Sequence, residues 1–378
     1  MRRPGPRGPF TARLDAALSG RPPHAPYLLP AAHAAVARAR AAATAGTFPL
    51  LADEDVQLGL TLLYELHYRG LDGVDDRWEW APDLLAARAV LEGGFEADLR
   101  AACARVTSGP VVDGPRPDTG EAFVAALFAL VQDDRGPLAP SPHGPLTTWL
   151  ARRADVAQWR EALAHRSVYH LKEADPHSWA IPRLAGGPKA ALVEVQADEY
   201  GGGRPERMHS ALFAATMREL GLSDSYGTYV DAVPATTLAT TNALTMFGLH
   251  RRLRGAVAGH LAAFEMTSSL PNRLYGNGLR RLGFGRAATA FFDEHVEADA
   301  VHEQVAGRDL AAALAVQEPD VAADVVLGAR ACLLLDAAAG RVLVDAWAAG
   351  HSSLRGGPDG VDAVGTALDL PEHRADVA

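Results

Sequence analysis

Helical sequence patterns follow one another along almost the whole chain, and no segment alternates apolar and polar residues over the length of a strand. Apolar residues recur at intervals of three and four positions, which places them on one face of a helix. Alanine is common and aromatic residues make up only 7% of the chain, a composition that favours helices over sheets. The sequence therefore predicts an all-α fold.

The expected helices lie between clusters of proline and glycine, which interrupt the periodic pattern. In the N-terminal part of the chain we place them near 31–43, 53–70, 81–103 and 121–132. In the remainder we place them near 146–173, 187–200, 205–220, 224–232, 236–249, 252–269, 286–305, 308–316 and 318–348. The two strongest interruptions are at 108–120 and 135–145.

Composition divides the chain into four regions. Residues 1–28 are rich in proline, glycine and arginine, and we expect this N-terminus to be loosely ordered. A boundary near 136–146 separates an N-terminal helical region, 29–145, from the main helical domain, 146–350. Residues 351–378 have the composition of a C-terminal tail.

Charge and cysteine usage exclude several classes of protein. A net charge of −10 does not suit a general nucleic-acid-binding protein, so no nucleic-acid partner is expected. Cys103 and Cys332 form no metal-binding spacing, and the start of the chain lacks the apolar run of a secretory signal, so a cytoplasmic location is expected. Charged residues interrupt the apolar stretch 324–347, so we expect a core helix there and no membrane span.

The segment 291–306, FFDEHVEADAVHEQVA, is the strongest candidate for a functional site. His295, Asp299 and His302 are spaced i, i+4 and i+7, so a helix places them on one face. A column of two imidazoles and a carboxylate suits a metal ion, whereas a polar outer helix face is the ordinary alternative. A single helix cannot enclose a metal, so further ligands must come from other segments.

Three further segments offer carboxylates and imidazoles at positions expected to face the core. Their candidate ligands are Glu173, Glu199, His209 and Glu265, with Glu194, Asp198 and His260 as competing donors. Glu199 and His209 bracket three consecutive glycines that would end one helix before the next begins. Glu265 lies among alanine, phenylalanine and methionine, where a carboxylate is costly to bury unless it is paired or bound to a metal.

In chain order these residues resemble the haem-oxygenase-like diiron oxidases and oxygenases, the iron-containing redox enzyme family. The stretches ADEYGGG, MTSSLPNRLYGNGLRR and EHVEADAVHE carry the resemblance, which covers about 150–350. It implies a haem-oxygenase-like helical bundle that binds two non-haem irons and no haem. The implied iron ligands are Glu173, Glu199, His209, Glu265, His295, Asp299 and His302, with Glu199 as the best candidate for a bridging carboxylate.

The chemistry of these side chains agrees with the resemblance, because imidazole and carboxylate suit iron. Neither the paired Glu-x-x-His of ferritin-like bundles nor the His-Glu-x-x-His of zinc proteases occurs in the main domain. Outer hydrogen-bond partners that orient the histidines are expected among Tyr200, Asn272 and Tyr275.

The resemblance implies an enzyme that activates O2 to oxidise a small organic substrate of the amine, amino acid or fatty acid type, with natural-product biosynthesis as one setting. N-oxygenation, C–C cleavage and desaturation all stay open, as do the electron donor and a homodimer. A non-catalytic iron-binding or interaction protein on the same scaffold is the main alternative. Two others are a metal-free relative of the fold and a haem protein, which the carboxylates around the candidate histidines disfavour.

Overall fold

The computed structural model describes residues 1–44, 47–105, 120–132 and 141–356. Within these ranges every regular element is a helix, which confirms the all-α prediction. The side chains of residues 297–301 and most of the two proline- and glycine-rich stretches lie outside the described part, as does 357–378 of the expected tail. In the part of the chain that is described, no helix is long and apolar enough to cross a membrane.

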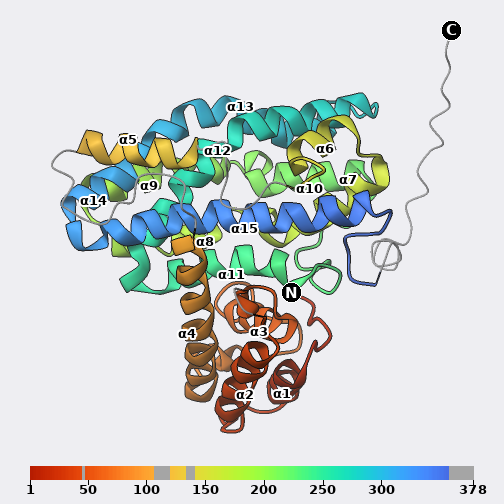
Figure 1. The fold of residues 1–378 in the computed structure, drawn as a ribbon, viewed down its shortest axis with the longest axis vertical. Coiled ribbons are helices and arrows are strands. Elements are labelled where there is room, and N and C mark those ends of the chain that lie inside the picture. The colour runs from red at the N-terminus through yellow and green to blue at the C-terminus, as the bar shows by residue number, and fades with distance from the viewer. Residues whose placement is uncertain (45–46, 106–119, 133–140, 357–378) are drawn as a thin grey trace.

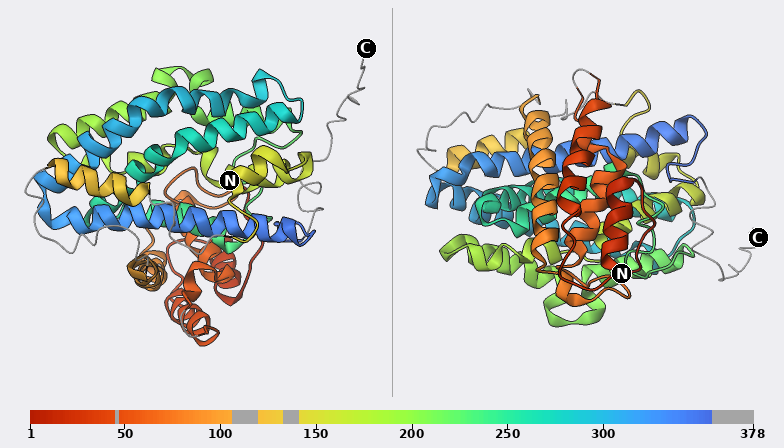
Figure 2. Two further views of the ribbon diagram at one scale, coloured as in Figure 1. Left: turned by 45° about the horizontal axis from the view of Figure 1, so that its top comes forward. Right: turned by 90° about the horizontal axis from the view of Figure 1, so that it is seen from below.

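The first four helices form a group on one side of the molecule (Figure 1). They are α1 (Pro9–Leu18), α2 (Leu28–Ala41), α3 (Glu54–Glu65) and α4 (Pro82–Arg105). Figure 2 shows the same group covering one face of the larger helical body from two other directions.

The remaining helices form the body of the molecule, with α15 running along it and α11 facing the N-terminal group (Figure 1). They are α5 (Gly120–Val131), α6 (Leu146–Arg152), α7 (Val156–His170), α8 (Asp175–Ser178), α9 (Gly186–Glu199), α10 (His209–Glu219), α11 (Ala235–Leu249), α12 (Arg254–Arg281), α13 (Arg286–Gln304), the π-helix η7 (Val305–Ala312), α14 (Ala313–Gln317) and α15 (Ala322–Ala348). Short 3₁₀ turns are η1 (Pro49–Leu51), η2 (Asp76–Trp78), η3 (Ile181–Arg183), η4 (Gly201–Gly203), η5 (Pro205–Arg207), η6 (Arg251–Leu253) and η8 (Pro319–Val321).

The N-terminus differs from the loosely ordered segment that its composition suggested. Residues 9–18 form α1, and the side chains of Phe10 and Leu14 are fully buried. The Asp55 carboxylate on α3 accepts hydrogen bonds from the backbone N–H groups of Phe10 and Thr11 at 2.9 and 2.8 Å. A carboxylate at this end of a helix satisfies N–H groups that have no partner within the helix, so α3 stabilises α1.

Several expected helices have different bounds in the structure, and three of them show the cause. The range 146–173 is broken between α6 and α7, where the Asp155 side chain caps α7 by accepting from the Gln158 N–H at 2.8 Å. The range 224–232 forms turns, with Gly227 at a φ of +80° that a helix cannot contain. The helix expected over 252–269 continues to Arg281 through Pro271, because burial along α12 outweighs the hydrogen bond lost at proline.

Packing places α5 with the body of the molecule. Phe123 and Leu127 of α5 are buried in one apolar cluster with Ala311 of η7 and Val325 of α15. Helix α5 therefore packs with the body of the molecule, and the boundary near 136–146 stays a prediction from composition.

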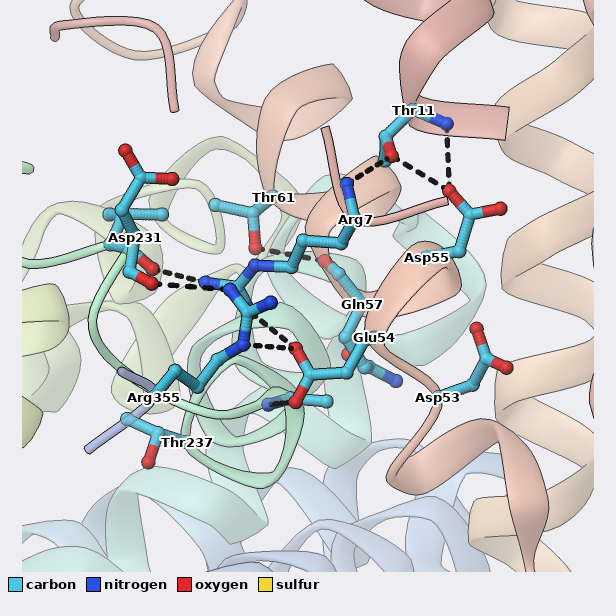
Figure 3. A network of polar contacts seen from close by, with 12 residues as sticks. Arg7, Thr11, Asp53, Glu54, Asp55, Gln57, Thr61, Asp231, Thr237 and Arg355 are labelled. Atoms are coloured by element: carbon cyan, nitrogen blue, oxygen red, sulfur yellow. Dashed lines mark hydrogen bonds and ion pairs between the residues drawn. The ribbon is translucent and has the colours of Figure 1, made fainter. Parts of the chain in front are cut away.

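A polar network joins the N-terminal group to the body (Figure 3). The buried Arg7 guanidinium lies 2.6 Å from Glu54 Oε2 on α3 and also donates to the Val230 carbonyl oxygen. Glu54 accepts from the Ala235 N–H at 3.0 Å, at the start of α11, and lies 3.5 Å from the Arg355 guanidinium. Glu54 thus joins the N-terminal segment, the start of α11 and the end of the described chain.

The backbones of helices α12 and α15 are in contact where the helices cross, because glycine residues occupy the contact positions. A Cβ atom on Gly259 would lie 1.8 Å from the Val325 carbonyl oxygen. A Cβ atom on Gly328 would lie 1.9 Å from the Ala256 carbonyl oxygen. Only glycine allows this approach, which brings α15 close to the helix that carries Glu265.

We expect a buried histidine in the body, His165, to make the stability depend on pH. His165 Nδ1 lies 2.7 Å from Thr237 Oγ1 and its Nε2 lies 3.1 Å from Ser353 Oγ. Burial lowers the pKa of His165 to about 3. In the unfolded chain His165 takes up a proton below the ordinary histidine pKa of about 6.5. In the folded chain it stays neutral down to about pH 3.

We expect the free energy of unfolding to fall as the pH falls through this window, by up to about 1.4 kcal/mol per pH unit from His165 alone. Urea unfolding of the wild type and of His165→Gln at about pH 7.5 and about pH 5 measures it. The wild type should lose about 2 kcal/mol more than the variant between these pH values. An equal loss in both proteins would show that His165 does not titrate in this way.

Candidate metal centre

Six of the seven expected ligands come together in the structure as two groups of three buried side chains. The first triad is Glu173, His209 and His295, and the second triad is Glu199, Glu265 and His302. In each triad, one nitrogen or oxygen atom from every residue lies within 4.8 Å of the others. Five separate segments of the chain supply these side chains.

Helix α13 contributes one histidine to each triad, His295 to the first and His302 to the second. The two residues are seven positions apart, so about two helical turns bring both to one face. Glu199 is the last residue of α9 and His209 is the first of α10, with the three glycines between them. The sequence predicted both the shared helix face and this helix–glycine–helix arrangement.

The two triads adjoin through Glu199 and His209. His209 Nδ1 lies 3.0 Å from Glu199 Oε2, so a residue of the first triad touches one of the second. Burial by itself would raise the pKa of Glu199. The interactions with His209 and then with His295 and His302 outweigh burial and bring the pKa down to about 2. Glu199 therefore carries a negative charge that faces both groups of ligands.

Hydrogen bonds set which ring nitrogen of each α13 histidine faces the site. His295 Nδ1 lies 2.7 Å from the Phe291 carbonyl oxygen, which requires a proton on Nδ1 and leaves Nε2, 3.8 Å from Glu173 Oε1, free to bind a metal. His302 Nε2 lies 3.0 Å from Asp198 Oδ2, so its Nδ1, 3.5 Å from Glu265 Oε2, faces the second triad. Burial lowers the pKa of His302, but Glu265 and Asp198 raise it, to about 9.

Several buried polar atoms of the triads lack a hydrogen-bond partner among the described residues. They are both carboxylate oxygens of Glu173, together with Glu199 Oε2, His209 Nδ1 and His302 Nδ1, whose contacts with one another and with Glu265 lack the geometry of a hydrogen bond. Burying such atoms without a partner is costly, and a bound cation would satisfy them. The mixed imidazole and carboxylate donors suit iron, so these residues fit an iron site.

Comparison with known proteins agrees with this geometry. Residues 160–337 match the family model described as iron-containing redox enzyme, and both triads lie within the match. This region belongs to the iron-containing redox enzyme family. No curated protein matches the chain. The family confirms the haem-oxygenase-like helical fold that the resemblance implied, and it supports an iron-dependent redox function for this part of the chain.

Asp299 belongs to α13 between the two histidines, but its side chain lies outside the described part of the structure. Its role as an iron ligand therefore stays a prediction. Of the competing donors, Glu194 is exposed on α9, and Asp198 acts as the hydrogen-bond partner of His302. His260 instead faces His177, with ring centroids 5.7 Å apart.

The hydrogen-bond partners of the triad histidines differ from those expected. Tyr200 donates its hydroxyl to Asp175 at 2.9 Å, away from the histidines. Tyr275 packs its ring against Trp159 and Phe292. The sequence shows that Asp198 immediately precedes Glu199, so either carboxylate could have been the ligand. Which of the two enters the triad and which one orients His302 depends on the side of α9 that faces α13.

The N-terminal group holds the turn that carries Glu173. The Lys172 ammonium is buried 3.7 Å from Glu65 Oε2 and 4.1 Å from the centre of the Tyr68 ring. Arg69 donates to the Leu171 carbonyl oxygen at 3.2 Å. The end of α3 and the residues after it therefore fix the backbone on the N-terminal side of Glu173, which sequence reasoning did not foresee.

Removing the Glu65 carboxylate by Glu65→Ala is expected to lower the free energy of unfolding by about 3 kcal/mol, because it leaves the Lys172 ammonium buried without its carboxylate. It should also weaken metal binding at the first triad, since the turn before Glu173 loses its support. Urea unfolding and Fe(II) titration measure the two effects. The double variant Glu65→Leu/Lys172→Met removes both charges and should recover most of the stability, and failure to do so would contradict the role of the pair.

Proposed function

We propose that this iron-containing redox enzyme holds two non-haem irons, one at each triad, and activates O2 to oxidise a small organic substrate. The observation that carries the proposal is the contact between the triads, in which Glu199 of one lies 3.0 Å from His209 of the other. A carboxylate shared in this way would bridge the two metals. Glu173, His209 and His295 would hold one iron, and Glu265 and His302 would hold the second.

Two ferrous ions together supply the two electrons needed to reduce O2 to the level at which it can oxidise a substrate. The protein's own part is to hold the metals and to leave them open positions, since three side chains do not fill the coordination of iron. Burial of all six ligands excludes water from the site. The Phe291 carbonyl and Asp198 hold the outer ring protons of His295 and His302, so the inner nitrogens are the ones that would bind a metal, with release of a proton at His302.

The donor set does not favour haem. A haem site needs a histidine facing a flat apolar slot. Here the inner nitrogens of His209, His295 and His302 each face a glutamate. The alternative of a non-catalytic iron-binding protein is weakened by a mostly apolar cavity of about 130 Å³ between α7, α11, α12 and α15, since storage of iron alone needs no place for an organic molecule. His170 lies on its wall, with Nε2 3.8 Å from Glu173 Oε1 of the first triad.

Anaerobic titration with Fe(II) followed by rapid mixing with O2 tests the proposal. We expect two irons per chain and uptake of O2 by the loaded protein, with faster O2 consumption in the presence of a substrate from a panel of amines, amino acids and fatty acids. Binding of one iron only would contradict the two-metal site. Two irons that stay ferrous in the presence of O2 and the whole panel would favour the non-catalytic alternative.

A further inference from the structure

The residue that follows Glu173 has a backbone conformation that side chains other than glycine rarely adopt. Ala174, between α7 and α8, has a φ of +73° and a ψ of −29°, and it is the one non-glycine residue with a positive φ in the described part of the chain. At such a φ the Cβ atom crowds its own backbone, so the conformation persists only where the surrounding structure holds it. Strained backbone of this kind is found mainly at functional sites, and here it directly follows a triad ligand.

The position of the Glu173 carboxylate depends on this backbone. Neither of its oxygens has a hydrogen-bond partner among the described residues. Its contacts with His170 Nε2 and His295 Nε2 are both 3.8 Å long, which is beyond hydrogen-bond distance. The place of Glu173 in the first triad is therefore set by the turn that carries it. Lys172 and Arg69 hold the side of this turn that precedes Glu173.

Gln196 of α9 holds the other side of the turn. Its Nε2 donates to the Ala174 carbonyl oxygen at 2.8 Å and to Ser178 Oγ at 2.7 Å, so both amide hydrogens are used. The Ala174 carbonyl also accepts from the Ser178 N–H at 3.1 Å, but that bond is local to α8, whereas Gln196 comes from another helix. Gln196 is 3% exposed and its Oε1 has no hydrogen-bond partner in the described part of the chain. Because burying such an oxygen is costly, what this side chain contributes comes from its NH2 group.

A chain of hydroxyl groups joins the same turn to the end of α9. Ser178 Oγ lies 2.9 Å from the Tyr200 hydroxyl, which donates to Asp175 Oδ1 at 2.9 Å. Because Ser178 accepts from Gln196, its own proton can go to Tyr200, and every hydroxyl in the chain has a partner. Gln196 and Tyr200 flank Glu199, three positions before it and one after it. The turn of the first triad is thus tied to the helix end that carries a ligand of the second.

We propose that Gln196 is a positioning residue for the first triad. Its amide holds the Ala174 carbonyl in the strained turn, which directs Glu173 toward His209 and His295. Without this amide the turn relaxes toward an ordinary backbone conformation, and the Glu173 carboxylate moves out of the triad. As a statement about iron the inference rests on the proposed function, whereas the hold of Gln196 on the turn can be measured in the metal-free protein.

The first test is Gln196→Met, which nearly keeps the volume of the side chain and removes both hydrogen bonds. In anaerobic Fe(II) titration, we expect one iron to bind as in the wild type and the iron of the first triad to bind about tenfold more weakly, as is typical when a group that orients a metal ligand is lost. The same loss should appear in the His302→Ala background, which keeps only the first triad intact. Ser178→Ala removes one of the two bonds of Gln196 and should give a smaller loss in the same direction. If Gln196→Met does not fold, the comparison is made with Ser178→Ala.

Ala174→Gly distinguishes positioning from a general effect on folding. Glycine adopts a positive φ without steric cost, so the turn no longer depends on Gln196 to hold it. Ala174→Gly alone should bind two irons as the wild type does, and Ala174→Gly/Gln196→Met should recover most of the affinity that Gln196→Met loses. Urea unfolding of the four metal-free proteins should show the same non-additivity. Equal losses of iron affinity from Gln196→Met in both backgrounds would mean a role in folding only and would overturn the inference.

Gln57→Met is the matched control. Gln57 is also buried and its Nε2 donates to a backbone carbonyl, that of Leu50 at 2.6 Å, but it is on α3, which supplies no triad residue. It should lower the stability and leave the iron affinity unchanged. Unchanged iron binding by folded Gln196→Met, or an equal loss in Gln57→Met, would contradict the inference. A wild type that binds no iron at the first triad refutes the proposed function, whereas additive losses of stability in the metal-free proteins refute only the hold of Gln196 on the turn.

Discussion

Replacing Glu199 by alanine is expected to abolish binding of at least one of the two irons. Glu199 lies in the second triad and 3.0 Å from His209 of the first, so its loss removes a ligand that both metals would share. His302→Ala should likewise remove one iron, because His302 is the only histidine of the second triad. Anaerobic Fe(II) titration with a colorimetric iron count measures the result, and circular dichroism confirms that each variant is folded.

The matched control for this experiment is Glu194→Ala. Glu194 is on the same helix as Glu199, but it is exposed, so the variant should retain two irons. Full retention of two irons by Glu199→Ala or His302→Ala would remove the basis for the two-metal site. Loss of iron from Glu194→Ala as well would show that α9 as a whole, and not the Glu199 carboxylate, decides metal binding.

Gly259→Val is expected to destabilise the protein by more than about 4 kcal/mol, which is the range of exceptional single substitutions. A Cβ atom at this position would lie 1.8 Å from the Val325 carbonyl oxygen, so valine can be accommodated only if α12 and α15 move apart. Separation of these helices would also shift Glu265, and iron binding at the second triad should fall. Thermal and urea unfolding measure the change in stability.

Gly93→Val is the control, because Gly93 lies inside α4 and a Cβ atom there would have no atom within 4 Å. Valine has a somewhat higher helix propensity than glycine, so this variant should keep or slightly raise the stability. Near-equal stability of Gly259→Val and Gly93→Val would show that the crossing of α12 and α15 can relax at little cost.

The local pattern of apolar residues predicted most helices of this protein, and each failure has an identifiable physical cause. It missed α1 because proline and glycine surround Phe10 and Leu14, whose burial depends on α3. It ran a helix through Asp155, where the side chain caps a new helix instead. It ended a helix before Arg281, whereas the buried surroundings of α12 keep it helical past Pro271.

The spacing of His295 and His302 by itself determined that both would share a face of one helix, because helix geometry depends only on positions along the chain. The order of the other candidate ligands along the chain resembles that of the iron-containing redox enzymes, and this resemblance predicted that they would lie together around a metal site. Only the tertiary structure decided that Asp198 orients His302 and that Lys172 pairs with Glu65 of the N-terminal group.

The cavity was beyond the reach of the sequence for the same reason. In the sequence, Asp336 was one of the charges that interrupt an apolar helix, and Arg166 was one arginine among many. The packing of α15 against the body, which glycines on α12 and α15 permit, places them on the wall of one cavity. Periodicity fixes which way a side chain points from its own helix, whereas its partners depend on how distant helices pack, and no local pattern records that.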